Sequence, residues 1–133
     1  MFVVHAGDSR CYLYHNGAVE QLTTDHTLAR QMVEKGGMRL EDELTSRWSK
    51  VLWNVLGGTS KDEVVAEVRS VDLEEGDLIV LCSDGLHRYV EAKLLADVLS
   101  VTEEPGAVCR TLIDFAKASR GRTMSPRSLL GQT

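Results

Sequence analysis

Two short segments of this chain each place an aspartate beside a glycine at the end of an apolar run. The segments are Gly7-Asp8-Ser9-Arg10, after the apolar residues 2–6, and Ser83-Asp84-Gly85, after the apolar residues 78–82. Short apolar runs predict strands, and glycine permits the turns that follow them. The sequence therefore predicts two strands that deliver the Asp8 and Asp84 carboxylates to one cleft, where they can bind a hard divalent cation.

The composition is that of a single soluble domain. The chain has 133 residues, of which 43% are apolar and 26% charged, and this length suffices to bury a hydrophobic core. Its net charge of −5 argues against a nucleic-acid partner, because such proteins present a basic face. We find neither a signal peptide nor an apolar stretch of roughly 20 residues that would span a membrane. These features predict a cytoplasmic protein without a membrane segment.

The cysteines favour a reduced protein. Cys11, Cys82 and Cys109 are odd in number, far apart and in no CxxC pair, so neither a disulfide framework nor a zinc knuckle is indicated. Cys82 and Cys109 lie in apolar runs, which predicts that both thiols are buried. A reducing compartment agrees with the cytoplasmic prediction.

The N-terminal segment predicts a β-hairpin. Residues 2–6 and 11–14 favour strands, and His15-Asn16-Gly17 is a strong turn signal before a returning strand at residues 19–22. The connection Gly7-Asp8-Ser9-Arg10 lies between the first two strands, and we interpret it as a tight polar turn within the hairpin.

A helix is predicted over residues 26–35. Thr24 or Asp25 precedes it, and we favour Asp25 as its N-terminal cap, because an aspartate can accept hydrogen bonds from the first helical turn. Gly36-Gly37 ends it in the usual C-terminal way. Its apolar face is predicted to carry Leu28, Met32 and Val33.

The second half of the chain predicts two strands and then two helices. Residues 64–71 alternate apolar and polar side chains, which is the period of a strand. Residues 78–82 are all apolar, as is typical of a strand buried on both faces. Residues 91–100 and 105–119 repeat apolar side chains at helical spacing, with Pro105 in the first turn of the second helix. This order of strands and helices predicts an α+β fold.

Each acidic turn also has a purely structural interpretation. An aspartate beside a glycine often hydrogen-bonds its own backbone and so forms the turn itself. Asp8 also has Arg10 nearby as an ion-pair partner. Taken singly, neither Asp8 nor Asp84 predicts a metal site.

The histidines show no metal-binding pattern. His5, His15 and His87 have no partner at ligand spacing, which favours surface or packing roles. His26, directly after Asp25, is interpreted as a structural residue rather than as a proton donor.

Taken together, the motifs resemble those of one known family. In order along residues 2–122 they are Gly7-Asp8-Ser9-Arg10, Leu22-Thr23-Thr24-Asp25-His26, Gly57-Gly58, Leu73-Glu74-Glu75-Gly76-Asp77 and Leu81-Cys82-Ser83-Asp84-Gly85-Leu86. This series resembles the protein phosphatase 2C family, the metal-dependent (PPM-type) serine/threonine phosphatases. Several motifs in the same order are far more specific than any one of them.

The resemblance implies a four-layer αββα sandwich with a binuclear Mg²⁺ or Mn²⁺ site at one end of two packed sheets. In this family the metals activate the water that attacks phosphoserine or phosphothreonine, without a covalent phosphoenzyme. Asp84 matches the metal-ligating aspartate of the family, and Asp8 matches an aspartate that in some members binds a further, weaker metal. No catalytic residue beyond the metal ligands is implied. The supporting turn and structural positions are matched by Gly7, Ser9, Arg10, Ser83, Gly85 and Asp25.

The resemblance also indicates parts of the family pattern that the chain lacks. Upstream of this region the family carries an arginine that contacts the substrate phosphate and an Asp-Gly motif whose aspartate bridges the metals, and no counterpart is present here. We therefore expect residues 1–122 to be the C-terminal part of a PPM-type domain, a partial αββα sandwich without its N-terminal part. Residues 123–133 are expected to form an aberrant, disordered tail.

The last family motif is interrupted at residue 123. The family ends with Gly-(Arg or Lys)-Asp-Asn and a final apolar strand, whereas Gly121-Arg122 is followed here by Thr123-Met124-Ser125-Pro126-Arg127. Read one base out of register, with suitable synonymous third bases, codons for residues 123–130 can encode Asp-Asn-Val-Thr-Ala-Val-Val-Ala. A single-base deletion or sequencing error near Arg122 is therefore one hypothesis, which the nucleotide sequence tests. The domain would then lack its last strand as well.

Three functional hypotheses follow from these observations. The leading one is a metal-dependent protein serine/threonine phosphatase domain, present as a fragment that is inactive alone, whose partners are phosphorylated serine/threonine proteins and a cognate serine/threonine kinase system. The second is a non-catalytic pseudophosphatase, a module that binds phosphoproteins or another partner. The third is a half-site completed by another chain or by an oligomer. Metal titration separates the first two hypotheses, and concentration-dependent activity would mark the third.

Overall fold

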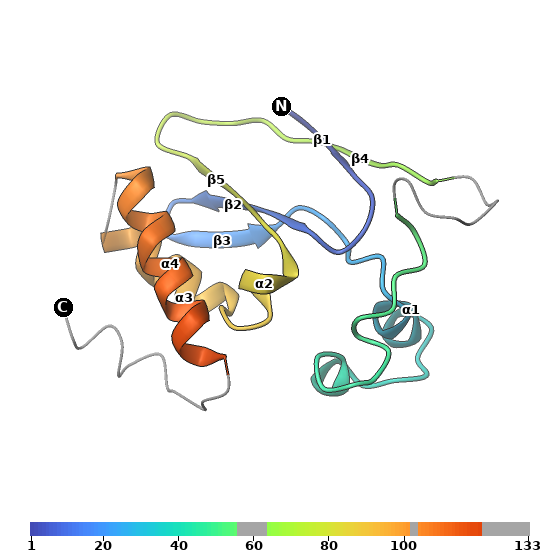
Figure 1. The fold of residues 1–133 in the computed structure, drawn as a ribbon. Helices are drawn as coiled ribbons and strands as arrows, with labels where there is room; N and C mark the ends of the chain where they lie inside the picture. The colour runs from blue at the N-terminus through green and yellow to red at the C-terminus, as the bar shows by residue number, and fades with distance from the viewer. Residues whose placement is uncertain (56–63, 102–103, 121–133) are drawn as a thin grey trace.

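Two small antiparallel sheets and a pair of helices form the body of the structure, a computed structural model that describes residues 1–55, 64–101 and 104–120 (Figure 1). The first sheet has the strand order β3-β2-β5, and its strands are β2 at Arg10–His15, β3 at Ala18–Gln21 and β5 at Leu78–Cys82. The second sheet pairs β1, Phe2–His5, with β4, Glu67–Ser70. The helices are α1 at Leu28–Glu34, the 3₁₀ helix η1 at Leu40–Asp42, α2 at Asp84–His87, α3 at Ala92–Val101 and α4 at Pro105–Ser119.

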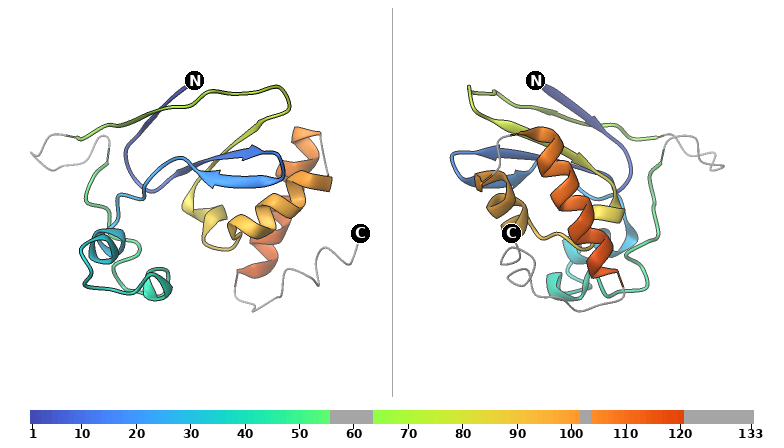
Figure 2. Two further views of the ribbon diagram at one scale, coloured as in Figure 1. Left: turned by 180° about the vertical axis from the view of Figure 1, so that it is seen from behind. Right: turned by 60° about the vertical axis from the view of Figure 1, so that its left-hand side comes forward.

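The two sheets and helices α3 and α4 stack in three layers, with these helices on one face of the β3-β2-β5 sheet and the β1-β4 sheet on the other (Figures 1 and 2). Tyr12 and Val80, which are register partners on β2 and β5, face the main core under α3 and α4. On the opposite face, Cys11 and Leu13 pack towards Val3 of β1. The fold is therefore α+β, as predicted, and its order of layers agrees with a partial αββα sandwich.

The predicted hairpin is confirmed for β2 and β3. His15 pairs with Ala18 across the turn, and Asn16 and Gly17 have φ values of 49° and 82°. Two consecutive residues with positive φ match the right-handed twist of the strands they join.

The predicted role of residues 7–10 as a turn within that hairpin is wrong. β1 pairs with β4 and not with β2, so this connection carries the chain from one sheet to the other. Gly7 makes the crossing with a φ of 115°, a conformation that side chains with a Cβ rarely adopt.

Helix α1 differs from its prediction at its start and on its buried face. Its N-terminal cap is Thr27, whose side-chain hydroxyl accepts a hydrogen bond from the Arg30 backbone N–H at 3.1 Å; Asp25 is not the cap. Its only buried residue is Ala29, because the helix lies away from both sheets, so the predicted apolar face is not part of the core (Figure 1).

The predicted C-terminal end of α1 is confirmed. The Gly37 N–H bonds to the Met32 carbonyl and the Gly36 N–H bonds to the Val33 carbonyl, while Gly36 has a φ of 79°. This is the Schellman arrangement that glycine favours.

The prediction that β5 is buried on both faces is wrong. Leu81 is 77% exposed and Ile79 also faces solvent, since no described element packs on this part of the strand. The outer face of the β1-β4 sheet is equally bare, with Phe2 74% exposed and the cross-strand pair Val4 and Val68 exposed as well. The described residues therefore present two apolar sheet faces without a covering layer.

Helices α3 and α4 are confirmed close to their predicted bounds, and their apolar residues Leu94, Val98, Leu112 and Phe115 form the main core. The short helix α2 was not predicted. The prediction that both the Cys82 and the Cys109 thiol are buried is wrong, because Cys109 is exposed and Cys82 is only half-buried. No helix among the described residues is long and apolar enough to cross a membrane. The predicted tail at residues 123–133 and the Gly57-Gly58 motif lie outside the described residues.

A charged contact ties the hairpin tip to the turn before β5. The His15 Nδ1 atom lies 2.5 Å from the Asp77 Oδ1 atom, and Asp77 Oδ2 accepts the Glu74 backbone N–H at 2.8 Å. The hydrogen bond to Asp77 raises the pKa of His15 above 6.5. The hydrogen bond from the Glu74 backbone N–H, and to a smaller extent the one with His15, lowers the pKa of Asp77 below 3.8.

The contact predicts a specific pH dependence of stability. The His15 contribution is fully present below pH 6.5 and is lost as the pH rises through the raised folded-state pKa, while the Asp77 contribution is lost only as the pH falls through its lowered value. In urea unfolding at about pH 5.5 and about pH 8.5, the wild-type chain should exceed His15→Gln in stability only at the lower pH. An equal difference at both pH values would contradict this prediction.

Candidate functional site

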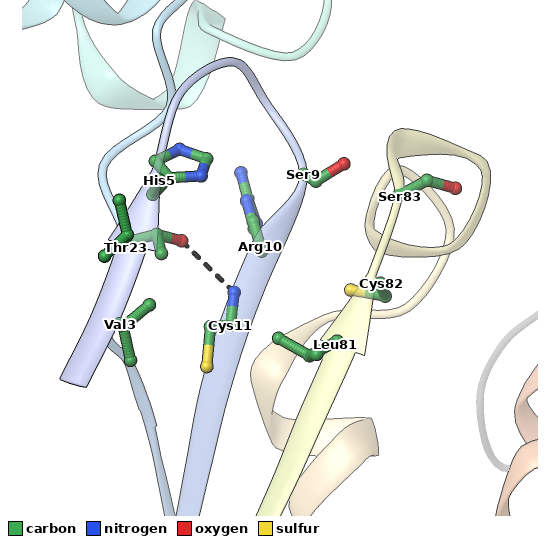
Figure 3. Close-up of a pocket in the computed structure, with 10 residues that line it drawn as sticks. Val3, His5, Ser9, Arg10, Cys11, Thr23, Leu81, Cys82 and Ser83 are labelled. Carbon is green, nitrogen blue, oxygen red and sulfur yellow. Dashed lines mark hydrogen bonds between the residues drawn. The ribbon is translucent and has the colours of Figure 1, made fainter. Parts of the chain in front are cut away.

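The two acidic turns lie at the same end of neighbouring strands. Arg10 at the start of β2 is the register partner of Cys82 at the end of β5. Because the strands are antiparallel, Asp8 lies two residues before this pair and Asp84 two residues after it. Ser9 and Ser83, the intervening residues, line one common cleft (Figure 3).

A buried histidine links the two turns. Helix α2 begins at Asp84, and His87, three residues later, donates from its Nε2 atom to the Asp8 backbone carbonyl at 2.7 Å. The sequence suggested only a surface or packing role for His87, because no local spacing connects residues 79 positions apart. The structure instead gives it a direct contact with the first acidic turn.

Neither turn carboxylate is committed to a hydrogen bond within the described part of the chain. The nearest cation to Asp84 is the Arg88 Nε atom, at 3.5 Å from Asp84 Oδ2, and this nitrogen makes no hydrogen bond to the described residues. The Asp84 side chain is 47% exposed. An aspartate that formed its own turn would accept nearby backbone N–H groups, as Asp77 does. Asp8 and Asp84 are therefore available to bind another group.

Gly85 does not play the predicted role of a turn glycine. It lies inside α2, and its φ is outside the left-handed region that favours glycine. A Cβ at this position would meet Ser83 Oγ at 3.5 Å and Arg120 Nη2 at 3.8 Å, which are ordinary contacts. Of the two glycines beside the aspartates, only Gly7 has a backbone conformation that favours glycine over other residues.

Arg10 and Asp25 form a buried, two-pronged ion pair. Arg10 Nε donates to Asp25 Oδ1 at 2.9 Å and Arg10 Nη2 donates to Asp25 Oδ2 at 2.6 Å, with side chains 13% and 6% exposed. Arg10 Nη1 also donates to the Tyr12 hydroxyl. Burial alone lowers the pKa of Arg10, but the hydrogen bonds with Asp25 and Tyr12 outweigh it and raise that pKa. Both residues thus serve the structure, holding the start of β2 to the segment before α1.

A cleft of about 380 Å³ runs between the two sheets towards the acidic turns (Figure 3). Burial raises the pKa of the Cys82 thiol to about 11, and it also raises the pKa of Cys11. Both thiols are therefore protonated at neutral pH and unsuited to nucleophilic catalysis. The cleft is lined by Val3, Val4, His5, Ser9, Arg10, Cys11, Thr23, Leu81, Cys82 and Ser83.

A second cluster, which the sequence did not indicate, joins His5, His26 and Glu67. Potential metal-ligating atoms of the three side chains lie within 4.8 Å of one another. Glu67 is 41 residues beyond His26, so only the pairing of β1 with β4 brings them together.

The hydrogen bonds of His26 argue against a metal in this second cluster. Its Nδ1 atom accepts the Gly7 backbone N–H at 3.1 Å and the Asn54 side-chain amide at 2.9 Å, so the ring proton is on Nε2 and is donated to Glu67 at 3.2 Å. A metal on Nε2 would move that proton to Nδ1, where it would face two donors. The structure thus places His26 as a support for Gly7, as its structural interpretation anticipated.

The chain is similar to bacterial serine/threonine phosphatases, although no family model matches it. It is 35% identical over 97 residues to the serine/threonine phosphatase stp of Listeria welshimeri, covering 73% of this chain and 38% of that protein. The serine/threonine phosphatase of S. agalactiae superposes with a TM-score of 0.80 at 28% identity, covering 86% of this chain and 47% of that one. A catalytic domain of the serine/threonine protein phosphatase PstP in complex with 2 manganese ions gives a TM-score of 0.67 at 30% identity, covering 86% and 46%. The chain thus spans less than half the length of each of these relatives.

The Arg10–Asp25 pair predicts a large stability effect. Asp25→Asn should lower the free energy of unfolding by roughly 3 kcal/mol, because it leaves the buried Arg10 charge without its partner. Glu20→Gln, which breaks the exposed Glu20–Arg69 pair, is the matched control and should cost less than about 1 kcal/mol. Urea unfolding measures both, and equal losses in the two variants would contradict the structural role of Asp25.

Proposed function

Since this chain belongs to the protein phosphatase 2C family, we propose that it serves in the metal-dependent hydrolysis of phosphoserine and phosphothreonine. The observation that carries the proposal is that the segments holding Asp8 and Asp84 lie at one end of the β2-β5 pair, while neither side chain makes a hydrogen bond to the described residues. These aspartates are the proposed metal ligands. Gly7, Ser9 and Ser83 shape the turns that present them.

The donors at the two turns suit a hard cation. The side chains of Asp8, Ser9, Ser83 and Asp84 offer only oxygen atoms, the ligand type of Mg²⁺ and Mn²⁺. When bound, such a cation supplies a water of lowered pKa as nucleophile and offsets charge on the phosphoryl group. The manganese complex of the PstP relative supports Mn²⁺ or Mg²⁺ as the cofactor, and the binuclear site is proposed to be incomplete in this chain.

We further propose that residues 1–122 are the C-terminal part of a PPM-type domain and that the 133-residue chain is inactive alone. Two carboxylates leave most positions around a divalent ion to water, so they bind it weakly. The bare apolar faces at Leu81 and at Phe2 support this proposal, because a sheet normally buries such a face under another layer. The other half of the domain is the proposed covering layer.

The proposed substrates are proteins phosphorylated on serine or threonine, which implies a cognate serine/threonine kinase. The competing function is a pseudophosphatase that binds phosphoproteins or another partner without hydrolysis. The small number of acidic groups at the site favours that alternative, whereas their lack of hydrogen-bond partners among the described residues favours a metal ligand role.

The proposal predicts activity by complementation. With Mn²⁺ and a phosphothreonine peptide, the chain alone should show no efficient turnover, but it should become active once the N-terminal half of a PPM relative is co-expressed and residues 123–133 are replaced by the last motif and strand of that relative. Asp84→Asn should lower that activity roughly a hundredfold or more, because it removes a proposed metal ligand. Asp97→Asn, on the exposed face of α3, is the control and should change little.

Two results would overturn parts of the proposal. Mn²⁺-dependent hydrolysis by the unaided chain, abolished by Asp84→Asn, would show that the fragment is not inactive. Full activity of the complemented Asp84→Asn variant would remove Asp84 from the site.

A further inference from the structure

His87 has a hydrogen-bonding pattern that packing alone does not explain. The residue is 7% exposed, and its Nε2 atom must carry the proton because the Asp8 carbonyl can only accept. The other ring nitrogen, Nδ1, is buried and has no hydrogen-bond partner among the described residues. An unpartnered buried nitrogen costs roughly 1–3 kcal/mol, which a leucine of similar size would avoid.

The turn at Asp8 is held from two sides by two different histidines. On one side, His26 binds Gly7 twice, since the Gly7 N–H donates to His26 Nδ1 and the His26 backbone N–H donates to the Gly7 carbonyl at 2.8 Å. On the other side, His87 binds the Asp8 carbonyl at 2.7 Å. His26 belongs to the segment before α1, whereas His87 belongs to α2, the helix that carries Asp84.

The bond from His87 is therefore the link that spans the gap between the two carboxylates. The β2-β5 ladder ends at the Arg10–Cys82 pair, two residues short of each aspartate. Beyond that pair, the His87–Asp8 bond is the hydrogen bond among the described residues that joins residues 7–9 to α2. Without it, no hydrogen bond among the described residues beyond the Arg10–Cys82 pair would join the Asp8 turn to the helix that carries Asp84.

We propose that His87 is a positioning residue that fixes the Asp8 turn against α2 and so sets the spacing of the two carboxylates for one divalent cation. The inference rests on the proposed function in treating both aspartates as ligands. The His87 ring makes no hydrogen bond to either carboxylate and acts through the backbone of Asp8 and through its own helix. Groups that orient ligands in this way typically change metal affinity by about 10–100-fold when removed.

Two substitutions at residue 87 separate the hydrogen bond from packing. His87→Leu keeps an apolar side chain of similar bulk but removes the donor, while His87→Gln keeps an N–H donor at similar reach. His87→Leu should weaken Mn²⁺ binding about tenfold, and His87→Gln should recover most of that loss. To obtain these affinities, the 133-residue chain is titrated with Mn²⁺ and the concentration of free Mn²⁺ is measured by electron paramagnetic resonance.

A second readout does not depend on the metal. Backbone-amide exchange at residues 7–9 should become about tenfold faster in His87→Leu and return towards the wild-type rate in His87→Gln. Val98→Ala, which removes core volume in α3, controls for general destabilisation and should leave both the exchange at residues 7–9 and the Mn²⁺ affinity unchanged.

The aspartate variants test the proposed metal ligands, and the His87 variants test the positioning role of His87 separately. Mn²⁺ affinity that is unchanged in both Asp8→Asn and Asp84→Asn would contradict the proposed ligands, and amide exchange would then decide the role of His87 by itself. If those variants lose affinity but His87→Leu matches the wild type in affinity and in exchange, His87 is not a positioning residue. A His87→Gln variant that behaves like His87→Leu would equally rule out a positioning role.

Discussion

The buried ion pair between Arg10 and Asp25 is the interaction on which the rest of the structure depends. It ties the first residue of β2 to the segment before α1 through two hydrogen bonds, at 2.9 and 2.6 Å. Arg10 is also the register partner of Cys82, so the same residue locates the end of β5. The residue after Asp25, His26, holds Gly7. One ion pair thus brings together both strand ends and the turn that carries Asp8.

Around this pair the acidic groups divide into two kinds. Asp25 and Asp77 accept hydrogen bonds that hold segments of the fold together. Asp8 follows β1 and Asp84 begins α2, and their side chains accept none from the described residues; that difference supports a ligand role for them. A carboxylate that already accepts such structural hydrogen bonds would have to break them to bind a cation. The proposed site therefore draws on carboxylates that accept no hydrogen bond from the described residues.

Local signals predicted much of the fold, and contacts between distant residues account for the errors. Asn16-Gly17 and Pro105 act within a few residues, and the hairpin and α4 form where they indicate. Asp25 resembled a helix cap because no local pattern reveals its partner 15 residues away. The apolar run of β5 predicted burial on both faces, yet Leu81 is bare because a covering layer is absent from the described residues. For the candidate site, the sequence motifs identified Asp8 and Asp84. The contact of His87 with the Asp8 turn could not be predicted, because it forms only through the pairing of β2 with β5.

The central claim is that two separate turns form one cation site, and paramagnetic broadening by Mn²⁺ tests it most directly. Substoichiometric Mn²⁺ added to the isotopically labelled chain broadens the backbone amide signals nearest the ion, and this holds even for weak binding. The structure predicts that residues 7–9 and residues 83–86 broaden together and first, ahead of the amides near His5 and Glu67. Broadening centred on the His5–His26–Glu67 cluster, or on only one acidic turn, would contradict the claim.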